Sequence, residues 1–335
     1  MKLLHAADLH LDSPLSATPA LRRIQLMLPR MLAELCRSEG CDAVLLSGDL
    51  FDGQWSRQSL DALRGALAEM AVPVFISPGN HDFLSPDSPY IMEKWPENVH
   101  IFTSNVITSV TVPALDLRVY GAGYRGIDCD GLLEGFRAEG TERYHVALLH
   151  GDPTHVDSPY CPVTATQVRE SGLHYLALGH VHKGDSFWEG ETLCAWPGCP
   201  MGRGFDELGA KGVLIVTLEE LAQVRFVPLP VPCFHELETD DRTLSSLLPP
   251  TGSEDYYRIT LTGEQQEDVA ALLGRFPNLE LRDRRTPPID AWSALQEDSL
   301  EGALFRSLRQ QTEGPERELA ARIVRQLLDG QEVAL

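Results

Sequence analysis

Short apolar runs alternate with stretches of helical periodicity over residues 1–230. Helical spacing marks residues 20–38, where Pro29 is expected to kink or split the helix, and residues 57–70. Buried strands separated by helices predict an α/β sheet, and in such sheets ligands bind beyond the carboxyl ends of the strands. The strand-like runs are MKLLHAADLH (1–10), CDAVLLSGDLFD (41–52), VPVFISPGNHD (72–82), RYHVALLHGD (143–152) and LHYLALGHVH (173–182).

The pattern changes after the proline-containing run VPLPVPCF (227–234), which indicates a domain boundary. Beyond it, YYRITLTG, the helical EQQEDVAALLGRF (264–276) and LELRDRR suggest a small β-α-β unit. Residues 316–330 carry apolar side chains on one helical face. We therefore expect a main domain over 1–230, a small β-α-β domain over 235–290 and a helical tail over 291–335.

Each of five predicted strands ends in polar residues that could bind metal ions. Oxygen and imidazole ligands together suit Mn²⁺, Fe²⁺ or Zn²⁺. Alternating geometry allows Asp8, His10 and His182 to face one ion. The second ion would then face Asn80, His150 and His180, and Asp49 would lie between the two. The five strand ends carry Asp8 and His10, Asp49, Asn80 to Asp82, His150, and His180 with His182.

Paired ions would clamp a phosphate and activate a bridging water as the nucleophile for in-line displacement. His81 is next to the expected ligand Asn80 and is free to protonate the leaving oxygen, so it is the catalytic candidate. Asp82 is expected to organise the turn and support the ligands rather than bind a metal.

The segments DLH, GDLFD, GNHD, LHGD and GHVH, in this order, resemble the calcineurin-like metallophosphoesterase superfamily over residues 1–230. Within it, AADLHLDSPL, LLSGDLFD, PGNHD, YLALGHVHK and WPGCPMGRGFDELGAKGVLIV are similar to the SbcD/YhaO group of DNA-repair exonucleases. The resemblance implies a helix-flanked β-sandwich with a small α+β capping domain and terminal helices. It also implies a Mn²⁺-dependent, homodimeric nuclease whose partner, an SMC-like ABC ATPase, contacts the C-terminal region.

Charge bears on the expected DNA substrate. The chain has a formal net charge of −21, and residues 235–335 hold 20 Asp and Glu against 11 Lys and Arg. Such acidity opposes unaided binding of DNA. Arg203 and the RDRR segment (282–285) are candidates for local contacts with the substrate. The alternative is that these arginines are simply solvated among the acidic residues.

The sequence therefore predicts a dinuclear metal-dependent DNA phosphodiesterase, a 3′→5′ exonuclease with single-strand endonuclease activity in double-strand break repair. A small-molecule phosphodiesterase or phosphatase and a non-catalytic scaffold are the alternatives. The apolar face of residues 20–38 is the expected homodimer contact. No stretch approaches about 18 consecutive apolar residues, so no membrane partner is expected and the cytoplasm is the expected location.

Overall fold

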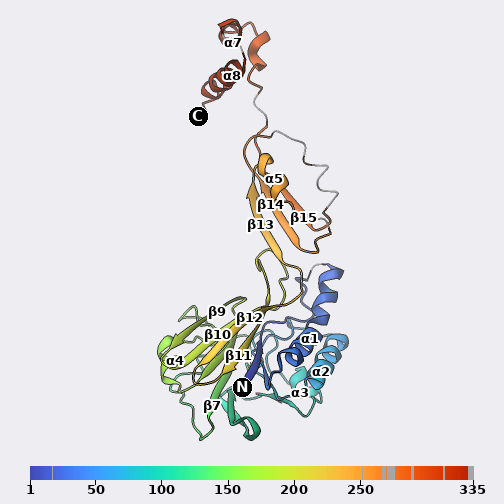
Figure 1. Cartoon of the computed structure of the whole chain (residues 1–335), viewed down its shortest axis with the longest axis vertical. Helices are drawn as coiled ribbons and strands as arrows, with labels where there is room; N and C mark the ends of the chain where they lie inside the picture. Colours follow the sequence, from blue (N-terminus) through green and yellow to red (C-terminus); the bar gives the residue numbers. More distant parts are fainter. Residues whose placement is uncertain are drawn as a thin grey trace. The chain divides into compact units, whose positions relative to one another are not determined.

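The computed structural model describes the chain except residues 17, 251, 266–268, 270–275, 288–289, 312–313 and 331–335. The chain divides into two compact units, Met1–His235 (unit 1) and Glu236–Leu335 (unit 2). Figure 1 colours the chain along its length. The domain limits predicted at residues 230 and 290 stay predictions.

Unit 1 contains two β-sheets, each with six strands among the described residues. The first has the strand order β12-β11-β1-β2-β3-β4 and the second has the order β5-β6-β7-β8-β10-β9. The strands of the first sheet are β1 (Lys2–Ala6), β2 (Ala43–Leu46), β3 (Val74–Ile76), β4 (Val99–Ile101), β11 (Gly212–Leu218) and β12 (Ala222–Pro228). Those of the second are β5 (Thr108–Val112), β6 (Leu117–Gly121), β7 (Tyr144–His150), β8 (Tyr175–Gly179), β9 (Lys183–Glu189) and β10 (Thr192–Gly198).

The strands that carry the predicted site residues pair with one another in parallel. β1 pairs with β2, β2 with β3, and β7 with β8, all in parallel register. Their carboxyl ends therefore lie at one edge of each sheet, where the polar segments follow.

Apolar side chains hold the two sheets and the helices in layers. Leu28 and Leu32 of α1 pack with Val44 and Leu46 of β2 on the outer face of the first sheet. The inner face contributes Leu45 to the core shared with the second sheet. The helices of unit 1 are α1 (Pro19–Glu39), α2 (Arg57–Met70), α3 (Pro89–Met92), α4 (Ala165–Glu170) and the 3₁₀ helix η1 (Pro113–Leu115). Figure 1 shows α1, α2 and α3 grouped together, and the predicted α/β fold with helix-flanked sheets is confirmed.

Helix α1 runs through Pro29 without interruption, so the predicted split is wrong. Proline removes one helical hydrogen bond. Pro29 lies on the buried side of α1 beside Leu28 and Leu32, and this packing against the sheet outweighs the lost bond. Thr18 caps the N-terminus by accepting a hydrogen bond from the Leu21 amide.

Unit 2 contains a small sheet with the strand order β13-β14-β15, in which β14 and β15 are parallel. The parallel pair is consistent with a β-α-β connection, although most of the helix predicted over 264–276 lies outside the described residues. The elements are β13 (Phe234–Thr239), which begins at the unit boundary, α5 (Asp241–Leu247), β14 (Tyr256–Leu261), β15 (Leu279–Asp283), η2 (Ser293–Gln296), α7 (Leu300–Gln311) and α8 (Pro315–Leu328). No helix among the described residues is long and apolar enough to span a bilayer.

Candidate metal centre

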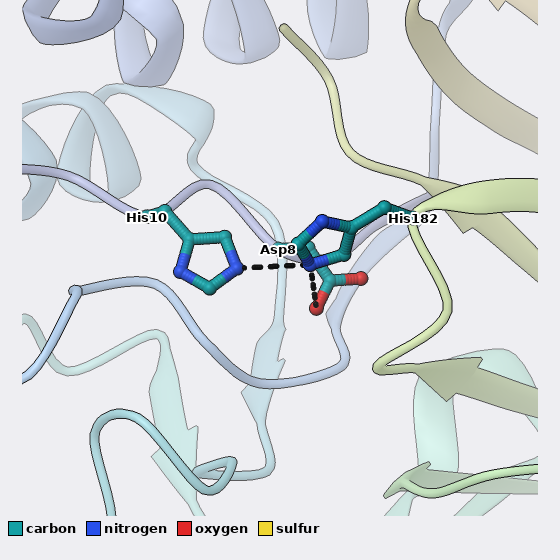
Figure 2. A group of neighbouring side chains, drawn as sticks. All are labelled: Asp8, His10 and His182. Carbon is teal, nitrogen blue, oxygen red and sulfur yellow. Dashed lines mark hydrogen bonds and ion pairs between the residues drawn. The ribbon is translucent and has the colours of Figure 1, made fainter. Parts of the chain in front are cut away.

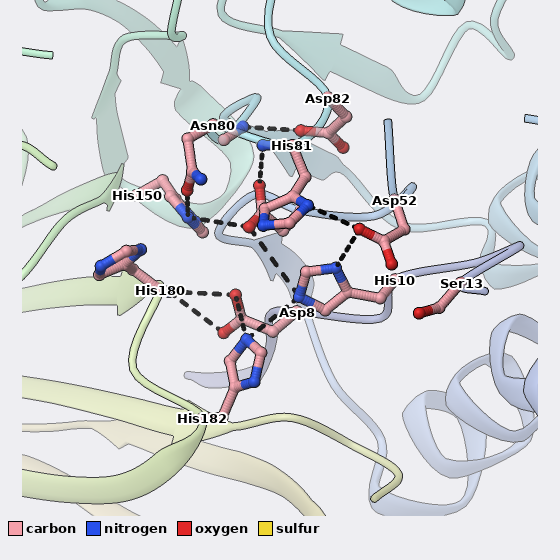
Figure 3. Close-up of polar contacts among 12 residues, drawn as sticks. Asp8, His10, Ser13, Asp52, Asn80, His81, Asp82, His150, His180 and His182 are labelled. Carbon is pink, nitrogen blue, oxygen red and sulfur yellow. Dashed lines mark hydrogen bonds and ion pairs between the residues drawn. The ribbon is translucent and has the colours of Figure 1, made fainter. Parts of the chain in front are cut away.

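The polar segments after β1, β2, β3, β7 and β8 converge at one place in unit 1 (Figure 3). Several of these residues have backbone conformations that non-glycine residues rarely adopt. The φ angles of Asp8, His10, Asp49 and His180 are 55°, 46°, 51° and 94°. Left-handed backbone at non-glycine residues is strained and concentrates at functional sites, where the surrounding structure holds it in place. Sharp turns directly after the strands thus bring these residues together.

Asp8, His10 and His182 form the first cluster of candidate ligands (Figure 2). His10 Nε2 lies 3.1 Å from His182 Nε2, and His182 Nε2 lies 3.9 Å from Asp8 Oδ1. Two imidazole nitrogens and a carboxylate oxygen that face one point are a donor set that divalent first-row metals accept. The residues therefore fit a metal ion.

His150 and Asn80 form the centre of a second cluster. His150 Nε2 is 2.9 Å from Asn80 Oδ1, and His150 Nδ1 is 2.8 Å from the Ser47 carbonyl oxygen, to which it donates. Burial lowers the pKa of His150, but the nearby charges of Asp49 and Asp8 outweigh it and raise this pKa to about 9. The carboxylates thus create a field that favours a cation at this point.

His180 lies beside this second cluster, with its ring centroid 5.3 Å from that of His150. Burial lowers the pKa of His180 to about 4, so its imidazole is neutral near pH 7, as a metal ligand must be.

Asp49 connects the two clusters. Its Oδ2 atom is 3.9 Å from His10 Nε2 and 3.3 Å from His150 Nε2. The carboxylate is buried, and its Oδ1 atom accepts a hydrogen bond of 2.9 Å from the His81 amide. A side chain at Gly79 would overlap the Asp49 carboxylate, so the close approach needs glycine there. Asp49 therefore occupies the intermediate position expected of a bridging ligand.

His81 is held by Asp52, a residue that the sequence analysis did not single out. His81 Nδ1 donates to Asp52 Oδ1 over 2.6 Å, and this hydrogen bond raises the pKa of His81. The His81 side chain is 45% exposed, so it is accessible to a substrate. Asp52 belongs to the same GDLFD segment as Asp49, which is the signal that could have identified it.

Glu207 is a second residue that sequence reasoning missed. Its Oε1 atom accepts a 2.7 Å hydrogen bond from His182 Nδ1 and forms a 2.6 Å ion pair with Arg203. Carboxylates commonly orient a metal-binding histidine through its second nitrogen, which could have prompted a search for one. The Arg203 side chain is only 8% exposed. This geometry favours a role for Arg203 in positioning His182 over the direct substrate contact expected from the sequence.

Asp82 lies behind the clusters rather than inside them. Its Oδ2 atom accepts a hydrogen bond of 2.7 Å from the Leu50 amide, and its Oδ1 atom accepts one of 2.8 Å from the Gly79 amide. The Tyr90 hydroxyl also donates to Oδ2. Asp82 thus joins the loops after β2 and β3, which is consistent with the supporting role predicted for it.

The arginines of the RDRR segment are engaged inside unit 2. Arg285 is 3% exposed and forms an ion pair of 2.8 Å with Asp241, and Arg282 lies 2.9 Å from Glu280. Two of the expected DNA-contacting charges are therefore already paired with carboxylates.

Comparisons with known proteins identify the family of the chain. The model of the calcineurin-like phosphoesterase family matches residues 1–184. The uncharacterized metallophosphoesterase YhaO of Bacillus subtilis (strain 168) is 33% identical over 239 residues, 64% of this chain and 57% of that protein. The SbcD component of the nuclease SbcCD from the same organism is 26% identical over 269 residues, 64% of this chain and 66% of that protein. The chain thus spans less than two thirds of either relative's length. A solved dimetal phosphatase from Danio rerio is 15% identical with a TM-score of 0.45, covering 68% of this chain and 98% of that one.

Proposed function

The chain belongs to the calcineurin-like phosphoesterase family, and from this premise we propose that it is a metal-dependent phosphodiesterase that hydrolyses DNA. The protein would degrade DNA as a 3′→5′ exonuclease and cut single strands as an endonuclease. It would do so in double-strand break repair. The similarity to the SbcD component of the nuclease SbcCD supports the choice of DNA. The position of Asp49 between two sets of candidate ligands is the observation that carries the dinuclear chemistry.

The residues divide into two ligand sets around Asp49. Asp8, His10 and His182 would hold one ion. The other ion would be held by Asn80, His150 and His180. Two divalent ions would neutralise the phosphate charge and make a water nucleophilic near neutral pH. We propose Mn²⁺, with Fe²⁺ and Zn²⁺ as alternatives, because the mixed oxygen and imidazole donors suit all three.

His81 is positioned to transfer a proton to the leaving oxygen. Asp52 accepts the Nδ1 proton, which fixes the orientation of the ring and leaves Nε2 as the atom that faces a substrate. Because the same hydrogen bond raises the pKa of His81, it also keeps more of the imidazole protonated near pH 7. Asp52 is therefore a positioning residue for the proposed acid.

The C-terminal helices support the proposal of a protein partner. Large apolar side chains on α7 and α8 are exposed: Leu300, Leu304, Leu319, Leu327 and Leu328. Exposed apolar patches mark protein–protein contacts. We propose that this surface binds an SMC-like ABC ATPase.

A homodimer through residues 20–38 has weaker support. Leu28 and Leu32 of this helix are fully buried in the core of unit 1, while Met27 is exposed. The helix thus presents little apolar surface to a second chain.

A phosphodiesterase acting on small molecules is the second candidate function. The net charge of −21 and the internal pairing of Arg285 favour it, because both weaken an extended DNA contact. The metal chemistry and the role of His81 are the same for either substrate.

The test compares two substrates with Mn²⁺-loaded protein: end-labelled linear DNA and bis-p-nitrophenyl phosphate. His81→Ala is the test variant. His145→Ala is the matched control, since His145 lies at the opposite end of β7 from His150. Shortening of the DNA by wild type and His145→Ala, but not by His81→Ala, supports the nuclease. Cleavage of the ester alone supports the small-molecule candidate, and cleavage of neither contradicts both and favours a scaffold.

A further inference from the structure

The cysteine side chains of two neighbouring loops lie in contact within unit 1. Cys129 belongs to the loop between β6 and β7, and Cys161 belongs to the segment between β7 and α4. The Cys161 amide donates to the Cys129 carbonyl oxygen over 2.7 Å, and the Cys129 amide donates to that of Pro159 over 2.9 Å. The two thiols also hydrogen-bond each other. Backbone and side-chain contacts therefore both join these loops.

This arrangement suits a disulfide bond between the two cysteines. An amide nitrogen is about 1.5 Å from its own Cα atom, and a carbonyl oxygen is about 2.4 Å from its own. With an N···O distance of 2.7 Å, the Cα atoms of Cys129 and Cys161 are at most about 6.6 Å apart. Disulfides span about 4.4–6.8 Å between Cα atoms, so a bridge needs no large movement of the backbone.

The two thiols differ in their access to solvent. Cys161 is fully buried, whereas Cys129 is partly exposed. The hydrogen bond from the Cys161 thiol also lowers the pKa of Cys129, which favours the reactive thiolate at the accessible position. Cys36 and Cys41 form a second pair of touching thiols, but both are buried. An oxidant in solution therefore reaches the first pair through Cys129 and meets only buried thiols at the second pair.

The Cys161 segment also packs against the second set of candidate ligands. The Asp152 amide, two residues after His150, donates to the Cys161 carbonyl oxygen over 3.1 Å. The ring centroid of Tyr160 lies 4.7 Å from that of His180. A bond that fixed Cys161 would thus fix the segment beside His150 and His180.

We propose that Cys129 and Cys161 form a reversible disulfide when a peroxide oxidises the protein, and that this bond fastens the segment beside the second ligand set. The Cys129 thiolate attacks one oxygen of hydrogen peroxide. The O–O bond breaks, Cys129 becomes a sulfenic acid, and the released hydroxide takes up a proton to form water. The Cys161 thiol then attacks the sulfenic sulfur, an S–S bond forms, and the hydroxyl group leaves with the thiol proton as a second water. The two thiols lose two electrons in total, and the peroxide gains them.

The test treats the full chain with hydrogen peroxide in the presence of a chelator, which prevents oxidation catalysed by bound metal. The remaining thiols are then blocked with N-ethylmaleimide in urea, and the peptides are mapped by mass spectrometry. Cys129 should be linked to Cys161 within one chain, while Cys36 and Cys41 should carry the maleimide. Dithiothreitol should break the link.

Two variants separate the roles of the two thiols from general reactivity. Cys161→Ala should stop the reaction at the sulfenic acid of Cys129, which dimedone labels. Cys36→Ala removes a buried thiol from the other pair and is the matched control. It should form the same link between Cys129 and Cys161 as the wild type does.

Hydrogen–deuterium exchange tests the effect of the bond on the segment. The amides of Tyr160, Cys161 and Val163 should exchange more slowly in the linked protein than in the reduced one, because local opening of the segment is restricted. Recovery of separate maleimide-labelled Cys129 and Cys161 after peroxide, or a link between Cys36 and Cys41 in its place, would overturn the proposed bond. Unchanged exchange in the linked protein would overturn the fastening of the segment.

Discussion

Acidification should destabilise unit 1 through the buried imidazole of His5. The ring is completely buried between the two sheets, with Nδ1 2.7 Å from the Tyr175 hydroxyl and Nε2 2.9 Å from Ser47 Oγ. Nε2 also lies 3.1 Å from the Leu178 carbonyl oxygen. The Leu178 carbonyl oxygen can only accept, so Nε2 carries a proton and donates it to Leu178. Nδ1 then accepts from the Tyr175 hydroxyl, and the imidazole is neutral. A second proton would have to be placed on the nitrogen that accepts from Tyr175.

The magnitude follows from the pKa of His5. Burial lowers this pKa from 6.5 to about 3. Below pH 6.5 the unfolded chain binds a proton at His5 and the folded chain does not, so stability is lost as the pH falls from 6.5 to 3. The loss is about 1.4 kcal/mol per pH unit. At pH 5.0 it therefore amounts to about 2 kcal/mol relative to pH 7.5.

The assay is urea unfolding of the full chain with a chelator present, followed by tryptophan fluorescence. Four of the five tryptophans lie in unit 1, so the signal reports mainly on that unit. His5→Gln should destabilise the protein at pH 7.5, and this effect should shrink by about 2 kcal/mol at pH 5.0. Tyr175→Phe keeps the imidazole and should retain the pH dependence of the wild type. An equal effect of His5→Gln at both pH values would refute the reasoning.

Three further changes test the metal centre. Glu207→Gln should lower the affinity for Mn²⁺ about 10–100-fold in calorimetry, because it weakens the hydrogen bond that orients the His182 imidazole. An unchanged affinity would rule out this role for Glu207. Asp52→Asn should reduce kcat at least about tenfold. Asp52→Asn should also shift the alkaline limb of the pH profile of kcat to lower pH, because His81 loses the partner that raises its pKa. An unshifted limb would contradict the pairing of Asp52 with His81. Gly79→Ala should reduce bound metal measured by elemental analysis, because the new methyl group crowds the Asp49 carboxylate; full metal content would contradict this.

The positions of the candidate ligands could be predicted because they depend on a repeated local pattern. Each lies just past an apolar strand, and parallel pairing brings the ends of β1, β2 and β3 to one edge. The same logic applies to His150, the last residue of β7, and to His180, which follows the parallel strand β8. Strand identity and chain direction were enough to bring these side chains together.

The residues that orient the ligands could not be found in this way. Glu207 lies 25 positions from His182, in a loop with no periodic pattern, and only the fold brings their side chains within 2.7 Å. The sequence predicts a substrate contact for Arg203, yet the same loop buries this side chain against Glu207. The uninterrupted helix through Pro29 likewise depends on packing against the sheet, which local propensity does not contain.

The most direct test of the dinuclear centre is the number of Mn²⁺ ions bound per chain, measured by anomalous diffraction at the manganese edge together with calorimetry. The account predicts two ions, one beside Asp8, His10 and His182 and the other beside Asn80, His150 and His180, with Asp49 contacting both. Asp49→Ala should then weaken binding of both ions. A single ion, or two ions of which Asp49→Ala affects only one, would contradict the account.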